Sequence, residues 1–243
     1  MPLSLFRDWR RRRVLDRPFP TKWRHILTER LPFYNQLSDD EKEAFENHLV
    51  IFLREKHWVG AGGLEVTEEM KVVISAAAAR IARHLPYSVY DRLAEIVVYH
   101  SDYRFPDDHR RILGTAYRFG TVVLSWDAVQ EGIDVPDDGR DTAIHEFAHV
   151  LDRASGAFNG TPLLERGRDY GPWAKVMGAH FQRLQDDALY TCLRSYGAQN
   201  EAEFFAVATE AFFETPDRIR ACAPDLYEVL ADYFKVEPRS VEE

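Results

Sequence analysis

The amino-acid sequence predicts an α+β domain in which helices dominate and a small β-sheet precedes a metal-binding helix. Three observations lead to this fold class. Apolar residues recur at helical spacing behind capping residues, only two segments have the composition of strands, and residues 145–149 form the pattern HExxH. The 243 residues, 45% of them hydrophobic, suffice for one substantial core. We therefore expect a single domain over residues 23–243, preceded by an N-terminal arm over residues 1–22.

The first 37 residues mix arginine, tryptophan and proline, which predicts an irregular arm with one short helix near residues 23–31. The arginine run at 10–13 is not followed by an apolar segment, so it does not begin a secretory signal. We expect it to be a solvated basic tail.

Two capped helices follow the arm. Ser38 and Glu41 have capping-box spacing, and the apolar residues after them predict a helix up to about Lys56. A glycine-rich turn comes next. Thr67 is then placed to cap a second helix that contains the alanine run at 76–79.

The strand candidates lie between these helices and the HExxH motif. Segments 95–99 and 117–124 are rich in β-branched or aromatic residues and are bounded by turn formers. A polar loop then leads to Asp141 or Thr142, either of which can cap the HExxH helix, which ends near Gly156. Three further helices are expected, at 172–189, at 201–214 behind the cap Asn200, and at about 224–234.

The net charge and the cysteine content limit the classes of partner and the cellular compartment that we expect for this protein. The formal net charge of −9 argues against nucleic acid or an anionic membrane surface as the main partner. No segment has the length and apolar character of a membrane span. The two cysteines, Cys192 and Cys222, are too few for a disulfide framework and lack the spacing of a thiolate zinc site. A reducing, cytoplasmic setting is therefore expected.

The HExxH motif predicts metal-assisted hydrolysis of a peptide bond. His145 and His149 lie one turn apart on the same helix face, so both imidazoles can reach one Zn²⁺ ion. Glu146 lies beside the metal, where it can accept a proton from zinc-bound water without occupying that water's coordination position. A single helix histidine is more often a buried core residue, but two histidines flanking a glutamate reverse that expectation.

Two parallel stripes on this helix support the assignment. Ile144, Ala148 and Leu151 recur at the spacing of a core-facing stripe, and His145, His149 and Asp152 recur one residue later. Asp152 is suited to accept a hydrogen bond from a ligand imidazole or to hold a neighbouring loop.

Catalytic zinc usually has three protein ligands and one open position, so a third donor is needed. Glu203 and Glu210 are the candidates, because both lie on one face of an apolar helix, where a carboxylate is costly unless it is paired or metal-bound. Glu203 also has capping-box spacing to Asn200, so its carboxylate can instead satisfy the start of the helix. From the residues alone the two interpretations are equal. His180 and His100 are isolated and disfavoured as ligands.

The run HEFAHVLD at 145–152 resembles the motif of the Mlc titration factor A family of zinc peptidases. Similar segments occur in the same order between about residues 23 and 235: LPFY at 31–34, REKHW at 54–58, GGLEVTEEM at 62–70, VLSWDAV at 123–129 and AEFFAVATEAFF at 202–213.

This resemblance implies a fold and site roles. It implies that Glu203 is the third zinc ligand and that Tyr196 donates a hydrogen bond to the oxyanion formed during hydrolysis. It also implies a gluzincin-like zincin core, similar to that of the anthrax lethal factor protease domain, with a strand edge beside the metal helix. The resemblance further implies binding of a transcriptional repressor of sugar uptake, for which the family is known, and aminopeptidase activity, which its characterised member has.

The leading hypothesis is a zinc-dependent peptidase acting on peptides or proteins, with aminopeptidase activity implied by the resemblance alone. The strand at 117–124 could pair with an extended substrate, or it is an ordinary core strand. The alternative is a regulatory binding protein that captures a transcriptional repressor or another partner, with zinc structural. A hydrolase of non-peptide bonds is disfavoured only by the resemblance.

Overall fold

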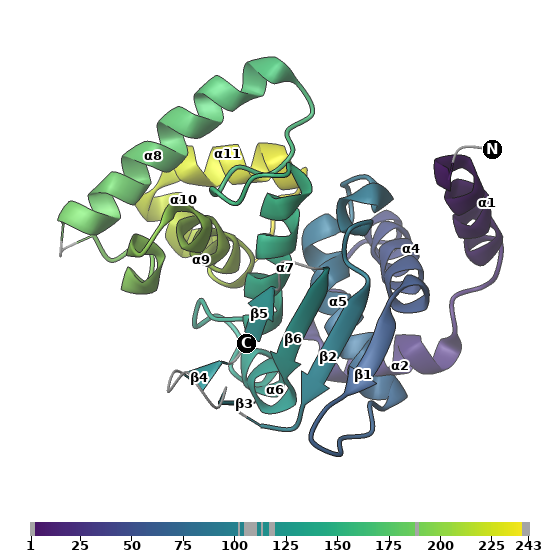
Figure 1. Cartoon of the computed structure of the whole chain (residues 1–243). Helices are drawn as coiled ribbons and strands as arrows, with labels where there is room; N and C mark the ends of the chain where they lie inside the picture. Colours follow the sequence, from purple (N-terminus) through teal and green to yellow (C-terminus); the bar gives the residue numbers. More distant parts are fainter. Residues whose placement is uncertain are drawn as a thin grey trace.

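A mixed β-sheet packed against helices, followed by a group of C-terminal helices, makes up the computed structural model (Figure 1). The structure describes residues 3–101, 103–104, 111–112, 114–116, 120–187 and 190–239. The strands are β1 (His57–Gly60), β2 (Glu95–Tyr99), β3 (Tyr103–Arg104), β4 (Arg111–Ile112), β5 (Gly114–Ala116) and β6 (Thr121–Ser125). The α-helices are α1 (Leu3–Leu15), α2 (Thr21–Arg30), α3 (Pro32–Asn35), α4 (Asp39–Glu55), α5 (Glu68–Ala82), α6 (Trp126–Asp134), α7 (Thr142–Ala154), α8 (Tyr170–Asp186), α9 (Glu201–Glu214), α10 (Pro216–Cys222) and α11 (Pro224–Phe234).

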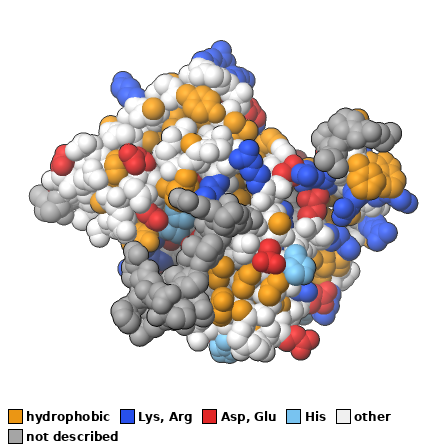
Figure 2. Space-filling model, viewed as in Figure 1, with side chains coloured by type: hydrophobic (Ala, Val, Ile, Leu, Met, Phe, Trp, Pro, Cys, Tyr) orange, Lys and Arg blue, Asp and Glu red, His pale blue; other side chains and the backbone are white. Residues whose placement is uncertain are grey.

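Helix α1 occupies the N-terminal segment, so the prediction of an irregular arm is wrong there, whereas the short helix predicted near residues 23–31 is confirmed as α2. Arg11 in α1 is buried and donates hydrogen bonds to Glu55 at 2.9 and 2.7 Å and to Asp91 at 2.6 Å. These partners are 44 and 80 residues away in sequence, which is why local composition does not indicate them. Phe6 and Trp9 of α1 stack with ring centroids 5.9 Å apart, and both are exposed. In the part of the molecule that α1 occupies in Figure 1, Figure 2 shows hydrophobic side chains next to Lys and Arg side chains.

Helix starts follow the predicted caps. Ser38 and Glu41 form the capping box at α4, with Glu41 N donating to Ser38 Oγ at 3.3 Å and Ser38 N donating to Glu41 Oε2 at 3.0 Å. The side chain of Thr67 accepts from Met70 N at the start of α5. Helix α6 was not expected from the sequence; its N-cap is Ser125, the last residue of β6.

The sheet has the strand order β1-β2-β6-β5, in which β1, β2 and β6 are parallel and β5 is antiparallel to β6. The predicted strand 95–99 is confirmed. The predicted strand 117–124 corresponds to β6 from Thr121 onward, and residues 117–119 lie outside the described part of the chain. Because β6 has a strand on each side, it is not free to pair with a substrate. Among the described strands, β5 is the edge beside α7 (Figure 1).

Helices α7 and α9 pack against each other through the centre of the core. Phe147 of α7 is fully buried and contacts Phe52 and Tyr90, with ring centroids 5.3 and 5.9 Å away. Most of α9 is buried, including Phe204, Phe205, Phe212 and Phe213. The helix ends before Pro216 as predicted, and Pro216 then begins α10.

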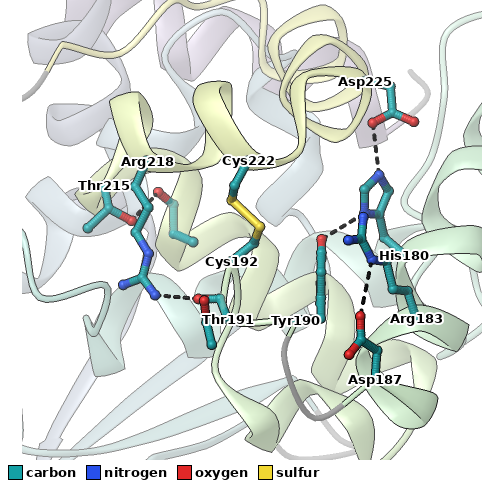
Figure 3. Close-up of a disulfide and its surroundings, with 11 residues drawn as sticks. His180, Arg183, Asp187, Tyr190, Thr191, Cys192, Thr215, Arg218, Cys222 and Asp225 are labelled. Atoms are coloured by element: carbon teal, nitrogen blue, oxygen red, sulfur yellow. Dashed lines mark hydrogen bonds and ion pairs between the residues drawn. A yellow bond between two sulfur atoms is a disulfide. The ribbon is translucent and has the colours of Figure 1, made fainter.

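Cys192 and Cys222 form a disulfide between the segment before α9 and the end of α10 (Figure 3). The expectation of a reducing, cytoplasmic setting rested partly on the view that two cysteines are too few for a disulfide framework. Because the two cysteines form a disulfide, their number no longer supports that expectation. Close by, Arg218 donates to the carbonyl oxygen of Thr191, and Tyr190 contacts His180. Within the described residues, no helix has both the length and the hydropathy needed to cross a membrane.

Candidate metal centre

Helix α7 presents the two histidines of the HExxH motif at the interface with α9. Asp141 caps the helix by accepting from Ile144 N at 2.9 Å. Ile144, Ala148 and Leu151 are fully buried, as their spacing predicts. Because this stripe faces the core, His145 and His149 are directed along the adjoining face toward α9.

Three potential ligand atoms converge there. His145 Nε2 and His149 Nε2 are 3.2 Å apart, and Glu203 Oε2 lies 3.1 Å from the first and 3.5 Å from the second. Donor atoms bound tetrahedrally to zinc at about 2.0–2.1 Å are about 3.3 Å apart. Two imidazole nitrogens and one carboxylate oxygen at these separations therefore fit a zinc ion, and no other such cluster occurs among the described residues.

Glu203 lies on the first turn of α9, where its backbone and its side chain have separate partners. Its backbone N donates to Asn200 Oδ1 at 3.0 Å, so Asn200 caps the helix. Its carboxylate turns to the histidines instead of completing a capping box. Burial alone would raise the pKa of Glu203, but hydrogen bonds from His145 and His149 outweigh burial and lower it to about 2. This geometry favours the ligand interpretation over the cap.

Glu146 lies beside the cluster, close enough to His145, His149 and Glu203 for their charges to shift its pKa. It is 4% exposed, and its Oε2 is buried with no hydrogen-bond partner among the described residues. Burial raises the pKa of this carboxyl, while the nearby His145 and His149 lower it less strongly. An unpaired carboxylate oxygen at this position is suited to hold or accept a proton.

Tyr196 lies at the rim of the site, on a short 3-10 helix at Ser195–Ala198. Its ring centroid is 5.8 Å from that of His145, and the side chain is 47% exposed. Burial of its inner part raises the pKa of Tyr196, and Glu203 and Glu146 raise it further. The hydroxyl therefore keeps its proton at neutral pH and can donate it in a hydrogen bond.

Glu210 has a role that the sequence did not indicate. It is not among the clustered ligand atoms; its Oε1 accepts from His145 Nδ1 at 2.6 Å and from Arg194 Nη2, and its Oε2 accepts from Asp141 N at 3.0 Å. Burial lowers the pKa of His145, but the hydrogen bonds to Glu203 and Glu210 raise it to about 10. The position of Glu210 on the same buried face as Glu203 was visible in the sequence, but its partners on α7 were not.

Asp152 holds a loop, which was one of its two predicted roles. Its carboxylate accepts from Gly160 N at 3.0 Å and from Thr161 N at 2.9 Å. Gly160 has a φ of +71°, and a Cβ there would lie 2.2 Å from the carbonyl oxygen of Glu201, so the close approach to α9 requires glycine. The loop brings the ring of Phe158 to 5.2 Å from that of His149.

The disfavoured histidines lie outside the cluster. His180 is buried and contacts Tyr190 Oη at 2.7 Å and Asp225 Oδ1 at 2.9 Å. His100 has an exposed side chain, 3.7 Å from Asp127.

An α+β fold with an HExxH helix and a glutamate from a second buried helix defines a zincin-like metallopeptidase domain. Comparison with known proteins agrees: residues 6–235 match the glucose-regulated metallo-peptidase family M90, and the chain belongs to that family. An uncharacterised Synechocystis protein, slr2042, is 36% identical over 246 residues, covering 95% of this chain and 90% of the relative. Mlc titration factor A of Yersinia pestis is 25% identical over 234 residues, covering 89% and 85%.

Proposed function

We propose that this protein is a zinc-dependent peptidase in which His145, His149 and Glu203 hold the metal. The observation that carries the proposal is the convergence of three donor atoms beside Glu146, whose Oε2 has no partner among the described residues. Membership of a metallopeptidase family supports it independently.

Zinc bound by such a set supplies a Lewis acid that activates water and polarises a carbonyl group. The chain supplies the proton transfers. Glu146 accepts a proton from the attacking water as the water oxygen adds to the carbonyl carbon. It then gives that proton to the amine nitrogen as the C–N bond breaks, so the carboxylate is regenerated. Tyr196 donates a hydrogen bond to the carbonyl oxygen, which becomes negatively charged during the addition.

Glu146→Gln tests the proton-transfer step, because glutamine has nearly the same size but cannot accept the proton. We expect zinc content to match that of the wild type and peptide cleavage to fall by about 10²-fold or more. Glu201→Gln is the matched control, since Glu201 is an exposed acid on α9. A fully active Glu146→Gln enzyme with zinc bound would remove this mechanism.

A more specific proposal is that the enzyme is an aminopeptidase, and this proposal rests on the family resemblance. Cleavage of peptide libraries with free and N-acetylated amino termini, each with and without a chelator, tests it directly. A strict aminopeptidase cleaves only the free set and loses that activity with the chelator. Equal cleavage of both sets would contradict the proposal.

The name of the Yersinia relatives supports a second candidate function. Mlc titration factor A is named for titrating Mlc. By analogy, the present chain would bind a transcriptional regulator in the cytoplasm. Pull-down with the wild type and with Glu146→Gln separates the two functions: a partner retained by both proteins is bound independently of catalysis.

A further inference from the structure

Glu210 and Arg194 surround the metal centre without belonging to the ligand set. We propose that they are a positioning pair, in which Glu210 fixes the ring of His145 and Arg194 connects Glu210 to the segment that carries Tyr196. The effect on catalysis rests on the whole of the proposed function, whereas the effect on metal affinity rests only on its metal-binding part, that His145, His149 and Glu203 hold the ion.

Glu210 joins three separate parts of the chain through one buried carboxylate. It is 2% exposed and projects from α9. One oxygen accepts from the ring of His145 and from Arg194, and the other accepts from the backbone of Asp141, the N-cap of α7. The same side chain therefore sets both the orientation of a ligand ring and the position of the helix that carries it.

The hydrogen bond to His145 leaves the correct nitrogen free for a metal. Since Nδ1–H of His145 donates a hydrogen bond to Glu210, Nε2 is the nitrogen that can lose its proton and bind a metal ion, and it is Nε2 that faces His149 and Glu203. The other ring lacks this support: Nδ1 of His149 is buried without a partner among the described residues. Orientation of the two-histidine set therefore depends mainly on Glu210.

Arg194 extends this arrangement to the rim of the site. It is the N-cap of the short helix that contains Tyr196, and its carbonyl oxygen accepts from Gly197 N at 3.1 Å. Its guanidinium pairs with Glu210, so a side chain attached two residues before Tyr196 is fixed to the support of His145. The disulfide at Cys192, two residues before Arg194, restrains the same segment. Glu210 thus restrains both His145, by a direct hydrogen bond, and the segment that contains Tyr196, through its ion pair with Arg194.

A simpler alternative is that Glu210 merely completes a buried ion pair that stabilises α9. Glu214 provides the matched control, because it lies one turn later on the same helix, is 3% exposed and pairs with Arg80. Glu210→Gln and Glu214→Gln each remove one buried, paired carboxylate from α9. Only the first contacts a metal-binding side chain.

Zinc affinity is measured by competition with a chelator of known Kd, and urea unfolding of each variant records stability separately. We expect the Kd for zinc to rise by about 10- to 100-fold in Glu210→Gln and to stay within about twofold of wild type in Glu214→Gln. Wild-type affinity in Glu210→Gln, or an equal loss in both variants, would overturn the proposal.

Arg194 is tested with a truncating and a conservative variant at saturating zinc. We expect Arg194→Ala to lower kcat by between about 10- and 100-fold with little change in KM, because the chemical groups are displaced while the peptide-binding surface is kept. Arg194→Lys should recover part of the loss. The Kd for zinc should rise in Arg194→Ala, but less than in Glu210→Gln. Wild-type kcat and wild-type zinc affinity in Arg194→Ala would show that Arg194 has no positioning role.

Discussion

Replacing Glu203 by alanine separates the two roles that the first turn of α9 could give this residue. The cap uses only its backbone N, which donates to Asn200 at 3.0 Å, so Glu203→Ala leaves the cap intact. The carboxylate, in contrast, is 3.1 and 3.5 Å from the two histidine nitrogens. The variant therefore removes a metal donor without removing the start of the helix.

The size of the effect follows from the number of donors. Structural sites with four protein donors bind zinc with a free energy of about 10–16 kcal/mol, so an equal share for one donor is about 2.5–4 kcal/mol. This corresponds to an increase of about 10²- to 10³-fold in the Kd for zinc. The reciprocal variant Asn200→Ala removes the cap, which we expect to lower the free energy of unfolding by about 1 kcal/mol and to leave zinc affinity unchanged.

Chelator competition gives the zinc Kd of each variant, and urea titration gives its free energy of unfolding. If the carboxylate of Glu203 is a metal ligand, the two effects separate: zinc affinity falls in Glu203→Ala, and the free energy of unfolding falls in Asn200→Ala. Wild-type zinc affinity in Glu203→Ala would refute the ligand assignment. An equal affinity loss in Asn200→Ala would mean that the intact helix start, and not the carboxylate, supports the site.

Three further predictions concern stability. Burial lowers the pKa of His48 from 6.5 to about 4, so the unfolded chain binds a proton at this residue more readily than the folded chain does. The free energy of unfolding should therefore fall by about 3 kcal/mol as the pH is lowered from about 6.5 to 4. Urea titrations of His48→Gln should show no such pH-dependent loss from this residue. Under oxidising conditions, Cys192→Ser should lower the free energy of unfolding by about 3–4 kcal/mol because the disulfide spans 30 residues, and dithiothreitol should destabilise the wild type but not the variant. Asp152→Ala should cost on the order of 2–4 kcal/mol by leaving two backbone N–H groups unpaired, and calorimetry showing an unchanged Tm would contradict this.

Features that depend on neighbouring residues were predictable from the sequence. The caps Ser38, Thr67 and Asn200 each bond within three residues, so their sequence spacing places helix starts accurately. The two stripes of α7 are equally local, because a helix with a buried Ile144 necessarily presents His145 beside it.

Features that depend on distant partners were not predictable in this way. Strand β1 has only four residues, and its pairing with β2 joins His57 to Glu95 across an intervening helix. Helix α1 depends on ion pairs of Arg11 to distant acids. The role of Glu210 requires α9 to pack on α7, and the spacing of acids along α9 does not show which of them faces the histidines. The residues alone did not decide whether the carboxylate of Glu203 binds the metal or caps α9, and it was the family resemblance that favoured the metal.

The carboxylates and guanidinium around the HExxH helix also have an electrostatic consequence for the choice of ion. When Glu146 is ionised, as proton acceptance requires, it contributes three negative charges together with Glu203 and Glu210, and Arg194, which pairs with Glu210, contributes one positive charge. With neutral imidazoles, these four groups carry a net charge of minus two, which a divalent cation balances and a monovalent cation only halves. Low-dielectric surroundings strengthen this preference, because uncompensated charge is costly where water is excluded. The arrangement therefore discriminates between ions by total charge as well as by donor chemistry.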